Sequence, residues 1–244
     1  MTERLKDRIA LVTGASRGIG RAVALRLAEE GATVVAVART QGALEELDDE
    51  IKARTGRNAV LVAEDLRQGD KIDQVGAALY QRFGRLDVLV GNAGTLGMLA
   101  PIGHVGIKQF DECMATNVTA NWRLIRSMDP LLRASDAGRA VFVTDGVARR
   151  DGHPYWGPYA ASKAALEVLV KTWAHEIEKV SKVRVNLIDP VRVRTRLRTS
   201  AFPGENPETV PLPETVVGAF VDLLVPEVDF TGRIVTLGEG GAAG

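Results

Sequence analysis

Short runs of aliphatic and β-branched residues alternate with amphipathic segments along the whole chain. The apolar runs predict seven β-strands, at residues 9–13, 33–38, 60–62, 86–90, 140–144, 183–188 and 234–237. The segments between them place apolar residues at helical spacing and predict helices at residues 18–30, 42–54, 71–83, 107–132, 159–180 and 214–224. Strands that are apolar along almost their whole length, with helices between them, indicate a parallel sheet covered on both faces.

Nothing in the sequence divides this pattern into separate units. A length of 244 residues suits one large domain or two small ones. No internal repeat, low-complexity tract or linker-like change of composition interrupts the chain. We therefore expect one doubly wound α/β domain over residues 1–244, with a mainly parallel seven-stranded sheet and helices on both of its faces.

Composition and charge exclude several classes of function. Lysine plus arginine and aspartate plus glutamate number 31 each, so the formal net charge is zero. This balance gives no electrostatic reason to expect a nucleic acid or a membrane surface as a partner. The N-terminus lacks the apolar core of a signal peptide, and no apolar run is long enough to span a membrane. We therefore expect a cytoplasmic protein.

The cysteine and the histidines indicate little chemistry of their own. Cys113 is the only cysteine, which rules out an internal disulfide, and its amphipathic helical surroundings favour buried packing. His104, His153 and His175 lack the spacing of metal ligands and have no cluster of cysteines or carboxylates beside them. We predict no metal site.

Tyr159 and Lys163 stand four residues apart in a predicted helix. A four-residue step places both side chains on one helix face, within reach of each other or of one ligand. A free tyrosine hydroxyl has a pKa of about 10, too high for proton transfer at neutral pH. A nearby ammonium favours the phenolate and lowers that pKa, which makes Tyr159 a candidate general acid/base.

A glycine-rich turn follows the first predicted strand and leads directly into a helix. Gly14, Gly18 and Gly20 are spaced as Gly-x-x-x-Gly-x-Gly. Glycines in this position allow the backbone to approach a pyrophosphate closely, and the helix N-terminus favours the anion. Between the first strand and first helix of a βαβ unit, such a turn predicts dinucleotide binding.

This glycine spacing, with the Tyr-x-x-x-Lys pair far downstream, closely resembles the short-chain dehydrogenase/reductase family, and the resemblance runs nearly end to end. It implies a Rossmann-type fold with a nicotinamide cofactor across the carboxyl ends of the strands. It also implies hydride transfer between that cofactor and a small-molecule carbonyl or secondary alcohol. The two long helices of the family commonly pair across two-fold axes, which implies a homodimer or a homotetramer.

The resemblance also implies roles for individual residues. Tyr159 would be the general acid/base, Lys163 would lower its pKa and bind the nicotinamide ribose, and Asn117 would hold a water beside the lysine. The segment at residues 91–94 resembles the family's Asn-Asn-Ala-Gly element but begins with glycine. The positions that the family uses for the cofactor are matched by Gly14, Ser16, Arg17, Gly18, Ile19, Gly20, Asp65, Leu66, Asn92, Ala93, Gly94, Tyr159, Lys163, Pro190 and Thr195.

Charge at the end of the second strand indicates which cofactor is used. An enzyme that uses NAD(H) usually offers a carboxylate there to the ribose 2′-hydroxyl, whereas this chain has Arg39. An arginine pairs with a 2′-phosphate, and Arg17 in the glycine turn is placed to add a second positive charge. The alternative is that both are solvated surface arginines. We predict NADP(H) rather than NAD(H).

The main departure from the family lies at the end of the fifth strand, where the family has a serine that holds the substrate oxygen. Asp145 takes this place when the strand is aligned, whereas a shift of one residue puts Thr144 or Gly146 there. An ionised Asp145 would repel an oxyanion and oppose the Tyr159 phenolate. A protonated Asp145, or the Thr144 hydroxyl, could donate as serine does. Asp145 could also point to solvent or cap a turn.

A second departure follows the sixth strand, where the family has Pro-Gly and this chain has Pro190 and Val191. A β-branched valine is unfavourable if the position requires a positive φ. Four arginines then alternate with other residues from 192 to 198, in a predicted flap of about residues 191–213. They either meet a cofactor phosphate or an acidic substrate, or form a solvated, mobile segment.

Two functions are compatible with these features. The first is an NADP(H)-dependent oxidoreductase, favoured by Tyr159, Lys163 and Asn117. The second is a nucleotide-binding protein of the same fold with little or no turnover, acting as a sensor or partner protein, favoured by Asp145 and Val191. The loop ahead of Tyr159 carries Tyr155 and Trp156, which either line the pocket or pack the loop down.

Overall fold

The computed structural model describes residues 3–238, which form a single Rossmann-like α/β domain. All seven strands are parallel and lie in the order β3-β2-β1-β4-β5-β6-β7. The predicted doubly wound sheet is confirmed. The strands are β1 (Ile9–Thr13), β2 (Thr33–Ala38), β3 (Val60–Ala63), β4 (Val88–Gly91), β5 (Arg139–Val143), β6 (Arg184–Asp189) and β7 (Ile234–Thr236).

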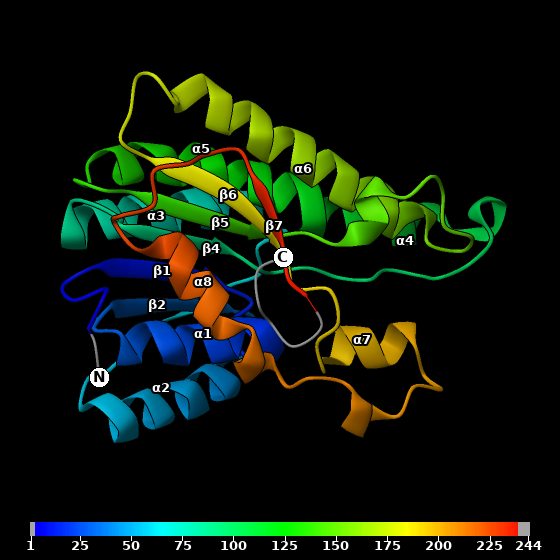
Figure 1. Ribbon diagram of the computed structural model, residues 1–244, viewed down its shortest axis with the longest axis horizontal. Helices are drawn as coiled ribbons and strands as arrows, with labels where there is room; N and C mark the ends of the chain where they lie inside the picture. Colours follow the sequence, from blue (N-terminus) through cyan, green and yellow to red (C-terminus); the bar gives the residue numbers. More distant parts are fainter. Residues whose placement is uncertain (1–2, 239–244) are drawn as a thin grey trace.

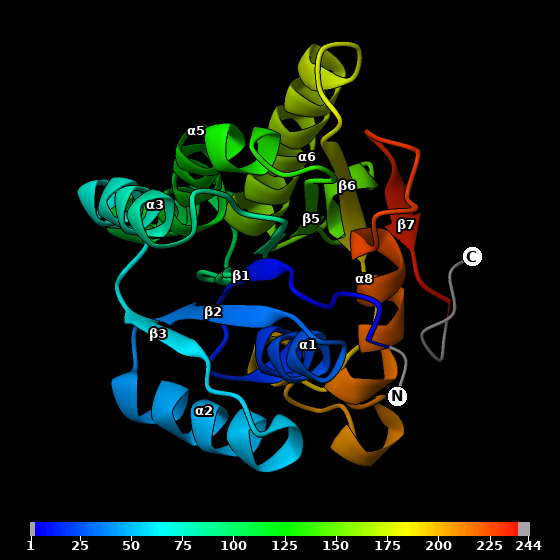
Figure 2. The same ribbon diagram turned by 90° about the vertical axis from the view of Figure 1, so that its left-hand side faces the viewer.

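Helices lie on both faces of the sheet (Figure 1, Figure 2). The helices α1, α2 and α8 pack on one face, and α3, α5 and α6 on the other. The α-helices are α1 (Gly18–Glu29), α2 (Gln41–Thr55), α3 (Gly69–Phe83), α4 (Ile107–Met114), α5 (Ala120–Arg133), α6 (Gly157–Ile177), α7 (Arg196–Ala201) and α8 (Val217–Leu224). Short 3₁₀ turns are η1 (Ile102–His104), η3 (Gly146–Arg149), η4 (Pro207–Thr209) and η5 (Pro213–Thr215).

The alternation of side chains along each strand divides the core into two halves. On β1, Ala10 and Val12 face the core beneath α1 and α8, whereas Leu11 faces the core beneath α5 and α6. Both halves are made mainly of buried aliphatic side chains. The continuous apolar runs of the sequence reflect this burial on two sides.

The helix predicted over residues 107–132 is not a single regular helix. It is formed by α4 and α5, which are joined by a π-helical turn η2 (Ala115–Thr119) with Asn117 at its centre. A π-turn inserts an extra residue and changes the direction in which neighbouring side chains point. The predicted helical stretch is therefore confirmed, and the π-turn within it was not predicted.

Parallel strands bring their carboxyl ends to one edge of the sheet, which in Figure 1 faces α4 and α7. The chain order reverses between the neighbouring strands β1 and β4. Such a switch point is where open α/β sheets bind ligands. Among residues 3–238, no helix has both the length and the apolar character needed to cross a membrane.

Candidate functional site

The glycine turn after β1 is held against the end of β4 by Thr13 and Asn92. The Thr13 hydroxyl accepts the backbone N–H groups of Asn92 and Ala93, each at 3.0 Å, and the Asn92 amide donates to the Thr13 carbonyl at 2.9 Å. Gly14 has a φ of +67°, and a Cβ on Gly20 would lie 2.3 Å from Asn92 Nδ2. These glycines are therefore required by the close packing of the turn, and Thr13 is a positioning residue that the sequence motifs did not single out.

The two arginines predicted to select the cofactor are exposed at this edge. Arg17 precedes α1 and Arg39 follows β2, and neither side chain forms an ion pair with another described residue. Asp65 lies near Arg39 but is bound by Arg67, whose hydrogen bonds hold the pKa of Asp65 below its usual value. The positive charge of Arg39 acts in the same direction. Exposed guanidinium groups beside a glycine turn fit the phosphates of a dinucleotide.

Other predicted cofactor residues have structural contacts of their own. The side chains of Ile19 and Leu66 pack against the two halves of the core, and Ser16 and Pro190 are partly exposed at the same edge. Thr195 caps α7 by accepting the Arg198 N–H at 3.1 Å.

The segments after β1, β4 and β6 converge. A Cβ on Gly18 would lie 3.3 Å from the Thr195 methyl group, so the segment after β6 lies against the glycine turn. A Cβ on Gly94 would lie 3.4 Å from Asn117 Oδ1 and 3.7 Å from Lys163 Nζ. The predicted cofactor-binding residues after β1, β4 and β6 therefore lie together with Tyr159 and Lys163 in one site.

Gly91 replaces the first asparagine of the family element because Phe142 occupies the space. A Cβ on Gly91 would lie 2.3 Å from Phe142 Cδ1 and 3.1 Å from Asn121 Oδ1. Asn121 Oδ1 is a buried acceptor that has no hydrogen-bond partner within residues 3–238. A larger residue at position 91 requires the phenyl ring to move.

Tyr159 and Lys163 lie on α6, buried beneath the end of β5. The Tyr159 hydroxyl donates to Asp145 Oδ2 at 3.2 Å, and Asp145 Oδ1 accepts the Val147 N–H at 2.9 Å. Lys163 Nζ donates to the Val143 carbonyl at 2.8 Å and lies 5.8 Å from the centroid of the Tyr159 ring. Asp145 therefore takes the place next to the tyrosine, and it also caps the turn that follows.

The pKa of Tyr159 is not lowered, as was expected from the nearby Lys163 ammonium. Burial raises the pKa of Tyr159 well above its ordinary value, and the neighbouring Asp145 raises it further. Burial lowers the pKa of Lys163, and the charge of Asp145 opposes this effect. The expected lowering of the tyrosine pKa is thus not the net effect in this structure, whereas the predicted opposition of Asp145 to the phenolate is confirmed.

Thr144 is held away from the tyrosine by a buried ion-pair network. Its hydroxyl donates to Glu167 Oε1 at 2.7 Å. Arg149 donates to both Glu167 and Asp189 and so ties η3 to α6 and β6. Since the Thr144 hydroxyl bonds to Glu167, it does not supply the missing serine hydroxyl in this arrangement. The Arg149 network could not be predicted from the sequence, because its members lie far apart in the chain.

Asn117 lies in the π-helical turn with its side chain fully engaged. Its Oδ1 accepts the Thr95 N–H at 2.8 Å, and its Nδ2 donates to the Thr95 carbonyl at 2.8 Å and to Ser162 Oγ at 2.9 Å. Cys113 is buried beside them, with its sulfur 3.7 Å from Ser162 Oγ, and burial raises the pKa of its thiol. Buried packing of the cysteine is confirmed. Asn117 connects the loop after β4 with α6.

Val191 has a left-handed backbone, with a φ of +58°. Its N–H donates to Asp189 Oδ1 at 3.0 Å. The positive φ that a glycine would adopt freely is thus imposed on a β-branched residue, which stores strain beside the site.

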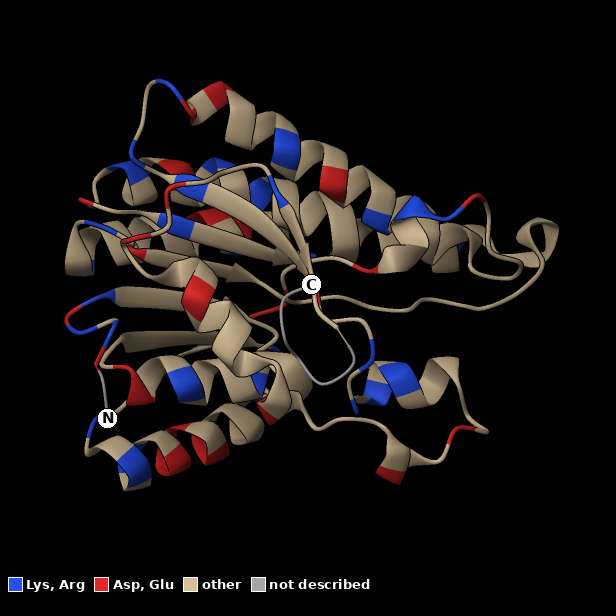
Figure 3. Ribbon diagram, in the orientation of Figure 1, with Lys and Arg blue, Asp and Glu red and all other residues tan. Residues whose placement is uncertain are grey.

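The arginines after Val191 are not a free solvated flap. Arg192 and Arg198 both bind Glu205, and the Arg194 guanidinium donates to a backbone carbonyl. Hydrogen bonds from Arg198, supported by Arg192, lower the pKa of Glu205 to about 2. Figure 3 shows the basic residues gathered on α7 and on the segment before it. Of the four, only Arg196 fits the predicted solvated segment.

The Trp156 ring packs against both Tyr159 and Phe202. The Trp156 ring lies 5.8 Å from that of Tyr159 and 5.6 Å from that of Phe202, between centroids. Trp156 is buried in a small apolar cluster with Leu96, whereas Tyr155 is 60% exposed. Trp156 therefore packs the loop down beside the candidate site, and Tyr155 remains at its rim.

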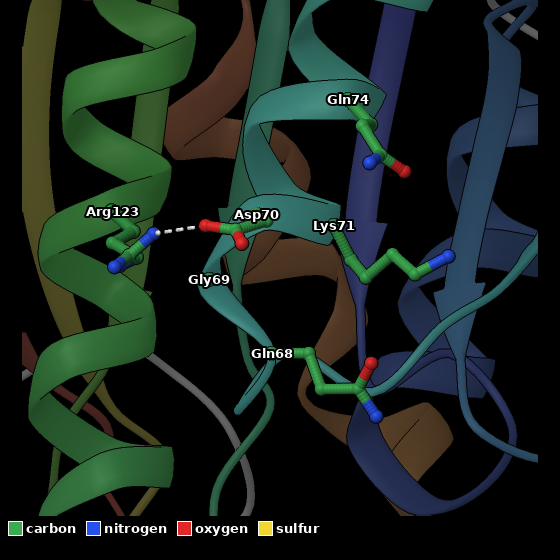
Figure 4. Close-up of a pocket in the computed structure, with 6 residues that line it drawn as sticks. All are labelled: Gln68, Gly69, Asp70, Lys71, Gln74 and Arg123. Atoms are coloured by element: carbon green, nitrogen blue, oxygen red, sulfur yellow. Dashed lines mark ion pairs between the residues drawn. The ribbon is translucent and has the colours of Figure 1, made fainter.

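A separate hollow of about 530 Å³ lies where α3 begins, facing α5. Arg123 reaches across it to within 3.6 Å of Asp70 (Figure 4). None of the predicted catalytic or cofactor residues lines it, so it is not the candidate site. Within residues 3–238, no group of three or more histidine, cysteine or carboxylate side chains is arranged to hold a metal ion.

Comparison with known proteins agrees with this geometry. A family model described as short chain dehydrogenase matches residues 8–206. The Escherichia coli oxidoreductase YciK is 37% identical over 222 residues, which cover 90% of this chain and 87% of that protein. An NADPH-dependent pterin aldehyde reductase of Arabidopsis thaliana is 34% identical over 195 residues, covering 80% of this chain and 78% of that protein.

A solved structure is similar over the same fold. It comes from a short chain dehydrogenase of Shigella flexneri complexed with NADP and matches with a TM-score of 0.92 and 35% identity, covering 97% of this chain and 99% of that chain.

Proposed function

Because the chain belongs to the short-chain dehydrogenase family, we propose that it is an NADP(H)-dependent oxidoreductase in which Tyr159 is the general acid/base and Lys163 assists it. The observation that carries the proposal is the buried Tyr159, whose hydroxyl donates to Asp145 and whose ring lies 5.8 Å from Lys163 Nζ, at the carboxyl edge of the sheet. Both the NADP complex of the Shigella flexneri relative and the NADPH-dependent relative support the cofactor assignment.

The residues that would hold the cofactor follow the carboxyl edge. The turn at Gly14 to Gly20 would receive the pyrophosphate, and Arg39, with Arg17, would pair with the 2′-phosphate. Lys163 would donate to the nicotinamide ribose, and Thr195 lies against the glycine turn, where it would contact the nicotinamide. When bound, the nicotinamide supplies or accepts the hydride.

The proton chemistry belongs to Tyr159. A tyrosine whose pKa is raised holds its proton throughout the neutral range, so the hydroxyl is present as a donor. It would give this proton to the substrate as the hydride arrives, which favours the reductive direction. The Lys163 ammonium would stabilise the phenolate that remains, and Asn117 would fix the loop and helix that flank both groups.

A second function is favoured by a specific observation. Asp145 occupies the position where the family has a serine, and Val191 stores strain where the family has glycine. A protein that binds the nucleotide and turns over little or no substrate would tolerate both changes. It would act as a sensor or as a partner of another protein.

We also propose that the chain forms a homodimer or homotetramer through α5 and α6. Trp122 on α5 is 44% exposed and Val168 on α6 is 65% exposed. Large apolar side chains exposed on neighbouring helices are typical of subunit interfaces.

One experiment separates the two functions. NADPH and NADH are titrated by fluorescence, and turnover is then followed through NADPH consumption with a panel of carbonyl compounds, for the wild type, Tyr159→Phe and Asp145→Ser. We expect NADPH binding by all three proteins and loss of turnover in Tyr159→Phe alone. Tight NADPH binding without wild-type turnover of any carbonyl or imine compound, with carbonyl reduction appearing in Asp145→Ser, would establish the binding protein instead.

A further inference from the structure

We propose that the reacting group of the substrate is a carbon–nitrogen double bond, an imine or its protonated iminium form, which is reduced to an amine beside Asp145. This inference rests on the oxidoreductase function proposed above and narrows its substrate class. The structural basis is a carboxylate that faces the tyrosine hydroxyl where a neutral donor would suit a carbonyl substrate.

Asp145 is bound in the manner of a carboxylate. Both of its oxygens accept hydrogen bonds, Oδ1 from the Val147 N–H and Oδ2 from the Tyr159 hydroxyl. The side chain is only partly buried, so it remains accessible from the site. An acceptor-only group beside the reacting atom selects a substrate that donates.

The neighbouring acids are held in ion pairs, whereas Asp145 is not. Arg149 forms ion pairs with Glu167 and Asp189. Lys163, the cation closest to the tyrosine, directs its ammonium to the Val143 carbonyl. Within residues 3–238, Asp145 forms no ion pair, which leaves its charge available to a cation in the substrate site.

This charge distinguishes two classes of substrate. Reduction of a carbonyl develops negative charge on oxygen, which a carboxylate at this position repels. A protonated imine instead presents an N–H⁺ group, and its hydrogen bond to Asp145 Oδ2 would be charge-assisted and among the stronger kinds. The same side chain therefore disfavours the first reaction and favours the second.

The surroundings of Tyr159 suit a flat apolar cation. The ring of Trp156 lies beside it, and Leu96 and Val147 complete the apolar cluster. Aromatic faces attract cations as well as apolar surface. We therefore infer a substrate in which the C=N bond belongs to, or adjoins, a cyclic or aromatic body.

The reaction balances with the groups named. The substrate carbon accepts one hydride from the reduced nicotinamide, and the electron pair of the C=N π bond becomes the lone pair of nitrogen. A protonated imine needs no further proton, since its nitrogen keeps the hydrogen bonded to Asp145. A neutral imine takes its proton from the Tyr159 hydroxyl, which recovers one from solvent.

The test uses two bicyclic compounds of similar size, 3,4-dihydroisoquinoline and 1-tetralone. Rates of NADPH consumption give kcat/KM for each compound with the wild type, Asp145→Ser and Asp145→Asn. Asp151→Asn is the matched control, because Asp151 is an exposed carboxylate in the same loop. Binding of the permanently cationic N-methyl-3,4-dihydroisoquinolinium to the protein with NADP⁺ is measured by calorimetry, as a readout independent of turnover.

We expect the wild type to prefer the imine. Removal of the charge in either Asp145 variant should lower the imine-to-ketone ratio of kcat/KM about 10- to 100-fold, the range that corresponds to loss of one charge-assisted hydrogen bond. It should also weaken binding of the N-methyl iminium, which has no N–H to donate, because the attraction between its charge and the Asp145 carboxylate is lost. The Asp151 variant should change neither quantity.

Two other outcomes separate this inference from the function on which it rests. A preference for the tetralone over the imine, with an imine-to-ketone ratio of kcat/KM that the Asp145 variants leave unchanged, overturns the inference and leaves the oxidoreductase intact. Absence of NADPH consumption with both compounds and no iminium binding, in protein shown to bind NADPH, overturns both.

Discussion

The left-handed backbone at Val191 allows a quantitative test of the strain beside the site. An L-residue in this conformation costs about 1–2 kcal/mol relative to the right-handed regions, and glycine avoids this cost. Glycine loses about 0.4–1 kcal/mol through its greater freedom in the unfolded chain. Val191→Gly should therefore be more stable than Val191→Ala by about 1 kcal/mol. Comparing these two variants removes the effect of the valine methyl groups, which both lack.

The control is the same pair of substitutions at Val180. This residue is 72% exposed and is not among the described residues with positive φ. There the order should reverse, with the alanine variant more stable by about 0.4–1 kcal/mol.

Urea unfolding of all four variants measures these differences, and for a chain of this length the melting temperatures at position 191 should differ by about 2–4 °C. An alanine variant at 191 that equals or exceeds the glycine variant in stability would refute the assignment of strain to Val191.

Three further predictions concern charge. Asp145→Asn should lower the pKa of Tyr159, because it removes the charge that adds to the effect of burial; an unchanged tyrosinate titration, followed by ultraviolet difference absorbance, would contradict this. Arg39→Asp should weaken NADPH binding about 10-fold or more while affecting NADH less; equal losses in fluorescence titrations would remove Arg39 from the 2′-phosphate. The pKa of Glu205 lies at about 2, below its ordinary 4.5, chiefly through Arg198, so its stabilising effect is complete above about pH 4.5 and disappears as the pH falls towards 2. The difference in melting temperature between the wild type and Glu205→Gln should shrink over that range, and a difference independent of pH would count against the ion pair.

Much of the fold could be predicted because the inner strands are buried on both faces. The apolar runs at β1 and β2 have no competing interpretation, and the segments between the strands are long enough for helices. The π-helical turn at Asn117 could not be predicted. It leaves the apolar periodicity nearly intact on both sides, so only the backbone hydrogen bonds reveal it.

The candidate site was predictable where a motif fixes both residue and spacing, as for Gly14 and Tyr159. The site was not predictable where a shift of one residue in the alignment changes which side chain lies next to Tyr159. Asp145 and Thr144 are adjacent in the chain, yet one contacts Tyr159 and the other Glu167, because successive residues of an extended segment point in opposite directions. The pKa of Tyr159 was misjudged for a different reason. The sequence shows that Lys163 is near but does not show how deeply both groups are buried.

The contact between Gly91 and Phe142 constrains the order in which this chain can change. An asparagine at position 91 collides with the phenyl ring of Phe142. A variant with asparagine at 91 and a smaller residue at 142 is therefore reached by changing Phe142 first. That first step leaves a cavity and destabilises the protein by up to about 3–5 kcal/mol. The second step fills part of the cavity and brings an amide donor towards Asn121 Oδ1, the buried acceptor without a partner among the described residues. Replacing Gly91 by asparagine and shortening Phe142 would then each destabilise the protein alone but compensate for each other together. The loss of stability in the single variants therefore separates the glycine form of the chain from the asparagine form.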